Sequence, residues 1–517
     1  MGEKCFFLMT KSFISSRWQL VLLGIGFIFS TKAAPVFWGE SNNRNLVSHE
    51  KNLPSVFNPK TGQNIAWSIP LGTETHSTPI IAGGRIFIGT NNGQPRDAKH
   101  DGDRGVMLCF DEKTQALLWQ LIVPKREGDP YQDWPKTGIS SPATIEGERV
   151  YLVSNRHEVM CLDARGLANG NDGPFVDEVR HQSPEAKPPV PLGPLDADIL
   201  WSFDMKAEAG IWPHDGSHTS ILIDGPFIYV NTGTGVDSTH KVIRGPDAPS
   251  LLVFEKMTGR LIAREREGIA PNIFHSTWSS PSLGVINGQK LVFFAGGNGI
   301  IYAFEAIKKT SPPNEVQTLK KIWQFDFDPE GPKDAIHRFN TNRREGPSNI
   351  YGMPMLHESR LYVAGGGDIF WGKNAAWLKC IDLRGKLEGG SPKELWSYPL
   401  EKHVMSTPVL VDGLVFISDC GRKMHCVDAE TGKNYWTQDI QSEVWASPFV
   451  ADGKVYLGTR SGQFWVFATS KEKKILNQVE FGEPISATVT AANQTIYVAT
   501  MSKLFAIRNG VSEVQKK

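Results

Sequence analysis

Short apolar runs alternate with glycine-containing turns along most of the chain, and the pattern repeats. In the clearest copy, Thr407 to Trp436, a small residue and Pro precede an apolar run, Gly, a second apolar run, Gly, a third run ending in Asp, Thr-Gly and Trp. Eight copies align on their opening position, which is occupied in turn by Pro79, Pro142, Ser220, Pro281, Pro354, Pro408, Pro448 and Ala487. A unit repeated this often predicts a repeat architecture in which neighbouring units bury each other's apolar faces.

Each unit contains three short strand-like runs, such as 80–82, 85–89 and 106–110, and a fourth around its Trp. Four short strands per unit are typical of the blade of a β-propeller. The pattern therefore predicts an all-β fold: an eight-bladed β-propeller of four-stranded antiparallel blades. A large aromatic ring at one place per blade is expected to wedge between neighbouring blades, and the candidates are Trp67, Trp119, Trp201, Trp323, Trp396 and Trp436.

The last copy ends after its third strand, 503–507, and the missing half appears at the other end of the chain. Residues 58–67 carry Thr-Gly and Trp with no unit before them. We expect this N-terminal strand to complete the last blade and close the ring, which removes free sheet edges. The predicted organisation is a secretion signal over 1–33, an N-terminal lead segment over 34–54, one propeller over 55–508 and a polar tail over 509–517.

The spacing of Asp428, Thr431-Gly432 and Trp436, seen in degraded form at 111–119 and 255–263, resembles the PQQ-like (pyrroloquinoline quinone) repeat. This repeat is known from quinoprotein dehydrogenases and from the lipoprotein that assists outer-membrane β-barrel assembly. The chain also looks like a group of secreted bacterial PQQ-repeat proteins of unknown activity. In that group Trp-Arg-Gly-Pro precedes the propeller, and Phe37-Trp38-Gly39-Glu40 matches it in part. The resemblance covers 37–508 and implies the fold, whereas function belongs to individual sites.

The first 33 residues differ from the rest. Lys4, Lys11 and Arg17 precede an apolar run at 20–29, and Ala33 ends a segment with small residues. This pattern predicts a secretion signal cleaved after Ala33 and an exported protein, periplasmic or extracellular. The alternative is an uncleaved membrane anchor, for which the apolar run is short. After removal of the signal, no integral membrane span is expected.

The 55 basic residues balance the 55 acidic ones, so nothing indicates a nucleic-acid partner. Five cysteines follow the signal, and four of them occupy positions where other units carry small apolar residues, so we expect them to behave as small hydrophobes. Only Cys420 and Cys426 lie on adjoining strands and are placed for a disulfide. The five cysteines are Cys109, Cys161, Cys380, Cys420 and Cys426.

The expected partners are a protein or an extracellular polymer, and the expected state is a monomer.

Most of the chain beyond the repeat falls on one rim of the predicted ring. Seven long loops are expected there: 91–104, 125–138, 206–218, 234–250, 265–279, 328–352 and 366–376. Long loops on one face of a rigid scaffold favour a binding surface. The alternative is that they only cover the mouth of the channel. Two further insertions, 167–198 and 307–321, are expected on the opposite rim.

The segment before each innermost strand should point toward the axis. The candidates at this axial mouth are His76, His218, His275, Trp278, His403 and Trp445. Histidines near one axis favour either a metal site or a polar, hydrogen-bonded mouth.

Asp101, Asp103, Asp237 and Asp247 are candidate Ca²⁺ ligands, with solvated loops as the alternative. Arg338, Arg343 and Arg344 are candidates for binding an anion, with salt bridges to acidic loops as the alternative.

Quinoprotein dehydrogenases, as the resemblance implies, stack the quinone between a Trp and a ring of two adjacent Cys, with Ca²⁺ or a lanthanide held by Glu, Asn and Asp. This chain has no adjacent Cys and no C-x-x-C-H motif. It also lacks G-x-S-x-G, H-E-x-x-H and Walker motifs. No catalytic residue and no cofactor are therefore assigned.

The favoured function is a binding or scaffolding module that acts through its long-loop face. The alternative is a PQQ- or metal-dependent oxidoreductase, similar to an alcohol or sugar dehydrogenase, with an axial site that would hold PQQ and Ca²⁺. A pair of rim carboxylates that cleaves a sugar is a further alternative.

Overall fold

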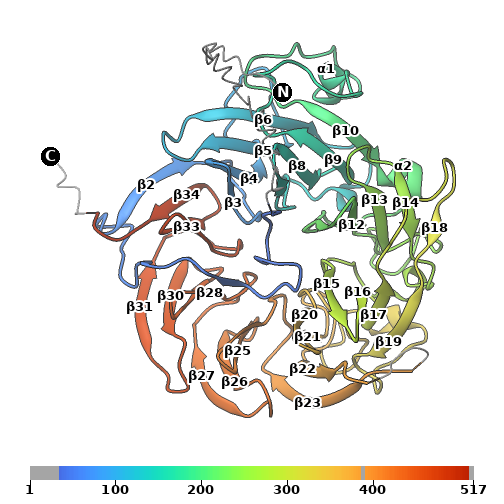
Figure 1. Cartoon of the computed structure of the whole chain (residues 1–517), viewed down its shortest axis with the longest axis vertical. Helices are drawn as coiled ribbons and strands as arrows, with labels where there is room; N and C mark the ends of the chain where they lie inside the picture. Colours follow the sequence, from blue (N-terminus) through green and yellow to red (C-terminus); the bar gives the residue numbers. More distant parts are fainter. Residues whose placement is uncertain (1–33, 386–389, 512–517) are drawn as a thin grey trace, which may run out of the picture. The chain divides into compact units, whose positions relative to one another are not determined.

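Eight sheets follow one another around a central axis, and each contains four strands in the antiparallel order of a propeller blade (Figure 1). Two of the sheets have a fifth strand that pairs in parallel, β1 (Val47–Ser48) or β18 (Gln317–Thr318). The computed structural model describes residues 34–385 and 390–511. The predicted secretion signal and residues 512–517 of the predicted tail lie outside the described residues. The predicted fold class, an eight-bladed all-β propeller, is confirmed. Among the described residues, no helix is both long and apolar enough to cross a membrane.

Blades are numbered 1 to 8 in chain order. The strands of blades 1 to 4 are β3 (Ile80–Ala82), β4 (Arg85–Asn91), β5 (Arg104–Asp111) and β6 (Leu117–Pro124); β7 (Thr144–Glu146), β8 (Arg149–Val153), β9 (Glu158–Asp163) and β10 (Ile199–Asp204); β11 (Leu222–Asp224), β12 (Phe227–Asn231), β13 (Leu251–Glu255) and β14 (Leu261–Arg264); and β15 (Ser282–Ile286), β16 (Gln289–Ala295), β17 (Ile300–Glu305) and β19 (Lys321–Asp326).

The strands of blades 5 to 8 are β20 (Met355–His357), β21 (Arg360–Gly366), β22 (Ala376–Asp382) and β23 (Lys393–Leu400); β24 (Val409–Val411), β25 (Leu414–Asp419), β26 (Lys423–Asp428) and β27 (Asn434–Asp439); β28 (Phe449–Ala451), β29 (Lys454–Gly458), β30 (Gln463–Ala468) and β31 (Ile475–Glu480); and β32 (Thr490–Ala492), β33 (Thr495–Ala499), β34 (Lys503–Ile507) and β2 (Ile65–Pro70). The remaining elements are short: β1 (Val47–Ser48), β18 (Gln317–Thr318), α1 (Glu178–His181), α2 (Met205–Ala209), η1 (Pro130–Gln132), η2 (Ala270–Asn272) and η3 (Ile336–Phe339).

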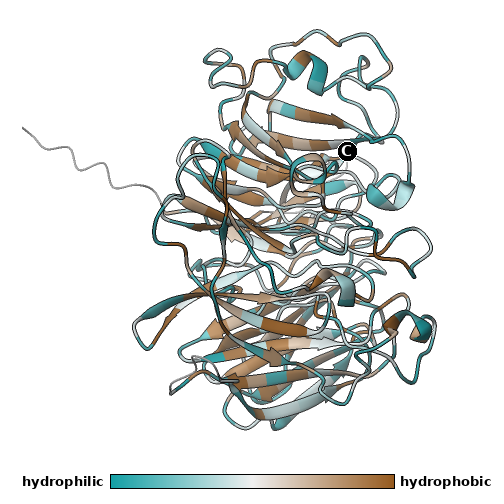
Figure 2. Ribbon diagram, turned by 90° about the vertical axis from the view of Figure 1, so that its right-hand side faces the viewer, coloured by the Kyte–Doolittle hydropathy of each residue, from teal (hydrophilic) through white to brown (hydrophobic). Residues whose placement is uncertain are grey.

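The ring closes as predicted, because β2 from the N-terminal part pairs antiparallel with β34 in blade 8. Tight turns of the predicted kind join the first two strands of a blade. In blade 6, Asp412 and Gly413 both have positive φ, 49° and 73°, which is the type I′ geometry that matches the twist of paired strands. Apolar residues concentrate on the strands and polar residues in the loops (Figure 2).

The repeated Trp packs between blades, as expected. Trp119 of blade 1 is fully buried, and its Nε1 donates a hydrogen bond to the carbonyl oxygen of Ala164 in blade 2, 2.9 Å away. The next blade presents a glycine to this ring: a Cβ on Gly166 would lie 2.7 Å from the indole. Trp201, Trp396 and Trp436 donate to the following blade in the same way. The Trp and Thr-Gly elements of the repeat therefore form one contact between successive blades.

The lead segment runs along the inner side of the ring. Carbonyl oxygens of Asn42, Asn43 and Leu46 accept hydrogen bonds from the innermost strands β15, β20 and β28, and β1 pairs parallel with β28. Arg44 is fully buried in this segment. Its guanidinium donates to the carbonyl oxygens of Pro281, Trp38 and Ser220 at 2.6–2.9 Å. Burial lowers the pKa of Arg44 to about 9. The lead segment therefore lies within the channel and touches blades that are far apart in the sequence.

Candidate functional site

A pocket of about 440 Å³ opens at the rim that carries the long loops. All eight blades contribute to its lining from the segment just before the innermost strand: Thr78, Ser140, His218, Trp278, Tyr351, Met405, Trp445 and Thr488. Because every blade takes part, the pocket lies on the propeller axis. The lead segment adds Trp38 to the lining, so the pocket is bounded by that segment on the channel side.

The long loops supply the remaining wall, which is mostly aromatic. Tyr131 and Trp134 come from loop 125–138, and Phe370 and Trp371 come from loop 366–376. Trp134 and Phe370 are also 42% and 39% exposed, so they form an apolar part of the pocket's edge. A concave, aromatic pocket with a few polar groups is the usual form of a small-molecule site.

Five of the six residues predicted at the axial mouth line this pocket, and the sixth does not. The five are His76, His218, His275, Trp278 and Trp445. His76 stacks on Trp445, with ring centroids 6.0 Å apart, and Arg460 lies over the same Trp at 4.1 Å. Burial lowers the pKa of His218 to about 3. His403 instead lies beside Cys420 and Glu443, where the ligand atoms of the three side chains are within 4.8 Å of one another.

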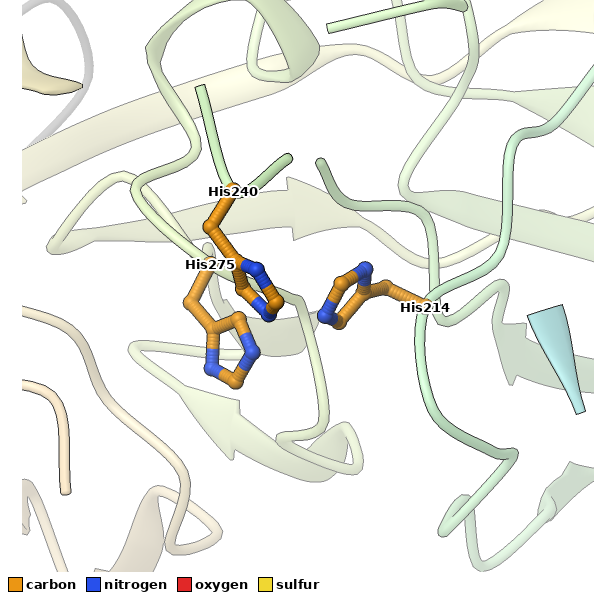
Figure 3. Close-up of side chains that lie close together, drawn as sticks. All are labelled: His214, His240 and His275. Atoms are coloured by element: carbon orange, nitrogen blue, oxygen red, sulfur yellow. The ribbon is translucent and has the colours of Figure 1, made fainter. Parts of the chain in front are cut away.

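Three histidines lie close together (Figure 3), and two of them, His240 and His275, line the pocket. His214, His240 and His275 come from three successive long loops and are buried. One ring nitrogen from each lies within 4.8 Å of the others. The ring centroids of His214 and His275 are 4.6 Å apart, and those of His214 and His240 are 4.8 Å apart. Three imidazoles at this spacing can share one metal ion. We call these residues the histidine triad.

His275, one member of the triad, is held in place by a hydrogen bond to Asp368. Its Nδ1 lies 2.9 Å from Oδ2 of Asp368, which is fully buried. Asp368 also accepts hydrogen bonds from the hydroxyl of Tyr351 and from the backbone nitrogen of Trp371. The carboxylate therefore holds the His275 ring in one orientation, and its other nitrogen, Nε2, is buried without a hydrogen-bond partner.

His214 is anchored in the same way by a different group. Its Nδ1 lies 2.7 Å from the carbonyl oxygen of Val236. That oxygen can only accept, so Nδ1 carries the proton and Nε2 has a free lone pair. Nε2 of His214 is also buried without a hydrogen-bond partner. A carboxylate or a carbonyl behind the far nitrogen is the usual support of metal-binding histidines.

The carboxylate of Asp215 faces both free nitrogens. One of its oxygens lies 3.7 Å from Nε2 of His214, and the other lies 3.7 Å from Nε2 of His275. Asp215 and His240 also adopt left-handed backbone, with φ of 65° and 56°, a conformation that costs energy in residues other than glycine. Asp215 thus adds a carboxylate beside two of the three histidines.

Electrostatics favour neutral imidazoles at two of the three positions. Burial lowers the pKa of His214 to about 2, and the neighbouring His275 and His240 add to this effect. Burial also lowers the pKa of His240. At His275 burial acts in the same direction, but the charge and hydrogen bond of Asp368 outweigh it and raise the pKa. Burial raises the pKa of Asp215 to about 6. Neutral imidazole is the form that binds a metal.

Sequence reasoning found His275 but missed His214, His240, Asp215 and Asp368. The prediction used only the positions just before each innermost strand, and these four residues lie elsewhere in the long loops. No short-range spacing links the three histidines, because each comes from a different loop. The one local signal is the His-Asp pair at 214–215, inside a loop that was already expected at this rim.

The three predicted anion-binding arginines do not share a site with the pocket. Arg343 donates to the carbonyl oxygens of Ile369, Phe370 and Gly372, so it braces the loop that carries Asp368. Arg338 lies over the ring of Phe339 at 4.8 Å. Arg344 is exposed. Anion binding by this group stays a prediction.

The predicted Ca²⁺ ligands of the long-loop face are mostly engaged with basic groups. Asp101 pairs with Arg104, and Asp103 accepts a hydrogen bond from the backbone nitrogen of Lys136. Asp237 pairs with Arg244 at 2.8 Å, and Asp247 is exposed. Within the described residues, none of these four belongs to a group of three potential ligands. The five described cysteines are all free and buried, and Cys420 and Cys426 are not joined.

Comparison with known proteins supports the architecture. A family model described as the outer membrane protein assembly factor BamB matches residues 385–513. The crystal structure of BamB from Moraxella catarrhalis has a TM-score of 0.51 and 12% identity, over 87% of this chain and 99% of its own. A europium-containing methanol dehydrogenase has a TM-score of 0.55 and 13% identity, over 90% of each chain. No curated protein matches the chain. At these identities the similar structures indicate the fold alone.

Proposed function

We propose that this chain, a β-propeller of the PQQ-like family, binds a transition-metal ion at the histidine triad and uses it to bind and act on a small molecule in the axial pocket. The observation that carries the proposal is the pair of buried Nε2 atoms of His214 and His275. Each lacks a hydrogen-bond partner, and each belongs to a ring whose other nitrogen is held by an acceptor. A buried polar atom without a partner is costly, and a shared cation removes the cost at both positions.

The donor set favours a borderline metal such as Zn²⁺ or another late first-row ion. Imidazole nitrogens suit these metals, whereas Ca²⁺ prefers oxygen ligands. The sequence alternative of Ca²⁺ with PQQ requires oxygen-rich ligands, and the triad provides nitrogen. The three imidazoles would hold the metal, and a metal with only three protein ligands keeps a position for water or substrate. It would supply a Lewis acid that polarises a bound carbonyl, hydroxyl or water.

The pocket wall points to a ligand with a flat, apolar part. Trp278, Trp371 and Trp445 line the pocket together with Phe370 and Tyr351, and aromatic walls favour planar groups. Among the polar lining groups, Arg460 is held over the Trp445 ring at 4.1 Å. The proposed activity is therefore metal-dependent chemistry on a small molecule that combines a planar part with a polar group.

The test is a metal titration of the purified full chain with Co²⁺ and Zn²⁺, followed by visible absorption and calorimetry. The native protein should bind one ion with the absorption bands of nitrogen-ligated Co²⁺. His214→Phe keeps an aromatic ring in the packing but removes the donor, so it should lose the bands while remaining folded. His49→Ala, which changes an exposed histidine, is the matched control. Equal Co²⁺ spectra for the native chain and His214→Phe would refute the proposal.

A second candidate function, protein or polymer docking through the long-loop face, is favoured by the exposed Trp134 and Phe370 at the pocket edge. Exposed aromatic residues around a pocket are common at interaction sites. Replacing both by Ser should abolish capture of such a partner but leave Co²⁺ binding intact. Loss of Co²⁺ binding in this variant would instead assign both residues to the metal pocket.

The proposal also places the protein outside the cytoplasm, on the strength of the signal-like pattern over residues 1–33. Export should remove this segment, so the mature chain should begin at Ala34. Intact-mass measurement of the protein recovered from the periplasm or the medium tests this. A full-length mass in the membrane fraction would instead support the anchor alternative.

A further inference from the structure

A cluster of carboxylates lies away from the axial pocket, where insertion 167–198 joins blade 2. Asp163 ends β9, Asp172 lies within the insertion, and Asp198 immediately precedes β10. Each offers one carboxylate oxygen, and these three oxygens lie within 4.8 Å of one another. We call these three residues the carboxylate cluster. None of them belongs to the sets of ligands that the sequence predicted.

Asp198 has an oxygen that no protein group satisfies. The residue is fully buried, and its Oδ1 has no hydrogen-bond partner. Its Oδ2 accepts one hydrogen bond, from the backbone nitrogen of Asp172 at 3.0 Å. Buried carboxylate oxygens are normally paired with donors or cations, because an unpaired one loses its hydration without compensation. The absence of a partner for this buried oxygen therefore indicates that the cluster binds a ligand.

Negative charge outweighs positive charge around this oxygen. Asp163 is paired with Arg165, at 3.2 Å between Oδ2 and Nη2, while the carboxylates of Asp172 and Glu178 also act on Asp198. Like charges held this close repel one another unless a cation lies between them.

Asn169 supplies a fourth group at the same place. Its Nδ2 donates hydrogen bonds to Oδ2 of Asp163, at 3.3 Å, and to Oδ2 of Asp172. The amide thus sits between two carboxylates, where a half-turn about its last side-chain bond would present its oxygen instead. Three carboxylates and one amide oxygen, with no nitrogen or sulfur donor, form the kind of set that Ca²⁺ prefers.

We propose that Asp163, Asn169, Asp172 and Asp198 bind a Ca²⁺ ion that fastens insertion 167–198 to blade 2. The ion bridges the end of β9, the beginning of the insertion and the start of β10, so it ties together both ends of the inserted segment. This site is independent of the histidine triad, because it uses different residues and oxygen ligands only.

The experiment is a Ca²⁺ titration of the full chain after treatment with EDTA, followed by calorimetry and by luminescence of Tb³⁺ as a Ca²⁺ substitute. Trp119 packs against Gly166, three residues from Asp163, and can sensitise Tb³⁺ on excitation of the indole. One Ca²⁺ should bind and displace Tb³⁺, and Mg²⁺ at the same concentration should not. Asp172→Asn changes an exposed member and should weaken binding at least about tenfold. Asp334→Asn, at an exposed carboxylate elsewhere, should leave binding unchanged.

Thermal unfolding separates a binding role from a structural one. In EDTA, Asp198→Asn should be at least as stable as the native chain, because the change removes repulsion. In Ca²⁺ the native chain should become the more stable of the two. His214→Phe should keep the Ca²⁺ effect, so failure of the triad proposal leaves this one standing. If Ca²⁺ does not raise the native melting temperature, or Asp198→Asn is destabilised equally with and without Ca²⁺, the proposal is overturned.

Discussion

Nδ1 of His275 and Oδ2 of Asp368 lie 2.9 Å apart, although the two residues are 93 positions apart in the chain. His275 comes from the loop before blade 4, and Asp368 lies between β21 and β22 of blade 5. The contact therefore depends on the packing of two blades. It also fixes which nitrogen of His275 faces the pocket, so Asp368 acts on the proposed metal through the imidazole.

Asp368→Asn should weaken metal binding at the triad by about 10- to 100-fold, the range expected for loss of a carboxylate behind a metal-binding histidine. The amide keeps the size of the side chain but loses the charge that favours the proton on Nδ1. Competition with a chromophoric chelator measures the change. Asp334→Asn is the matched control and should bind as the native chain does. Unchanged affinity in Asp368→Asn would show that the carboxylate serves only the hydrogen bonds to Tyr351 and Trp371.

Because Trp119 packs between blades 1 and 2, we expect that a larger truncation of its side chain lowers the free energy of unfolding by a larger amount. Trp119→Phe keeps most of the ring but leaves the carbonyl oxygen of Ala164 without its indole donor, which should cost about 1–3 kcal/mol. Trp119→Ala removes the whole buried side chain and should cost about 3–5 kcal/mol. Denaturation by guanidinium chloride measures both. Trp134→Phe, at a 42% exposed position, should change the unfolding free energy little, and a loss equal to that of Trp119→Phe would contradict the wedge.

Glu158 should make the protein sensitive to acid. Burial would raise its pKa, but His181 and Arg156, whose nitrogens lie 3.1 and 2.7 Å from its carboxylate, outweigh burial and hold the pKa well below its usual range. The lowered pKa contributes stability above the unfolded value of about 4.3, and this contribution is lost as the pH falls toward the folded value.

Glu158→Gln should therefore flatten the acid side of the stability profile. Between about pH 4 and pH 3 the native chain should lose up to about 1.4 kcal/mol more than the variant, the slope for one proton per pH unit. Unfolding free energies measured by urea denaturation at several pH values test this. Glu127→Gln, at an exposed carboxylate, should follow the native profile. Parallel profiles for the native chain and Glu158→Gln would refute the assignment.

The fold could be predicted from the sequence because each blade repeats the same local signals. The run from Asp428 to Trp436 contains a turn, a glycine and a wedge that recur in other blades, and each acts on the next blade in the same way. The histidine triad carries no such repetition. His214 and His240 become neighbours only because blades 2 to 4 place successive loops side by side, so their meeting depends on the curvature of the ring.

The carboxylate cluster could not be predicted from the sequence for a related reason. Asp163 is the Asp that ends a blade's third strand and so looked like part of the repeat, whereas Asp172 and Asp198 lie in or at the end of an insertion that was expected on the opposite rim. Only the fold of the insertion brings the three oxygens within 4.8 Å.

Closure of the ring by β2 predicts different outcomes for two truncations. A chain that begins at Ser55 lacks the lead segment but keeps β2, so blade 8 remains four-stranded and the protein should stay monomeric, with reduced stability because the buried Arg44 and Leu46 are lost. A chain that begins at Leu71 also lacks β2 and leaves β34 as a free edge with unpaired backbone groups, which should promote association through that edge. Light scattering coupled to size-exclusion chromatography distinguishes the two. If both truncated chains are monomeric and equally stable, β2 does not close the ring in solution.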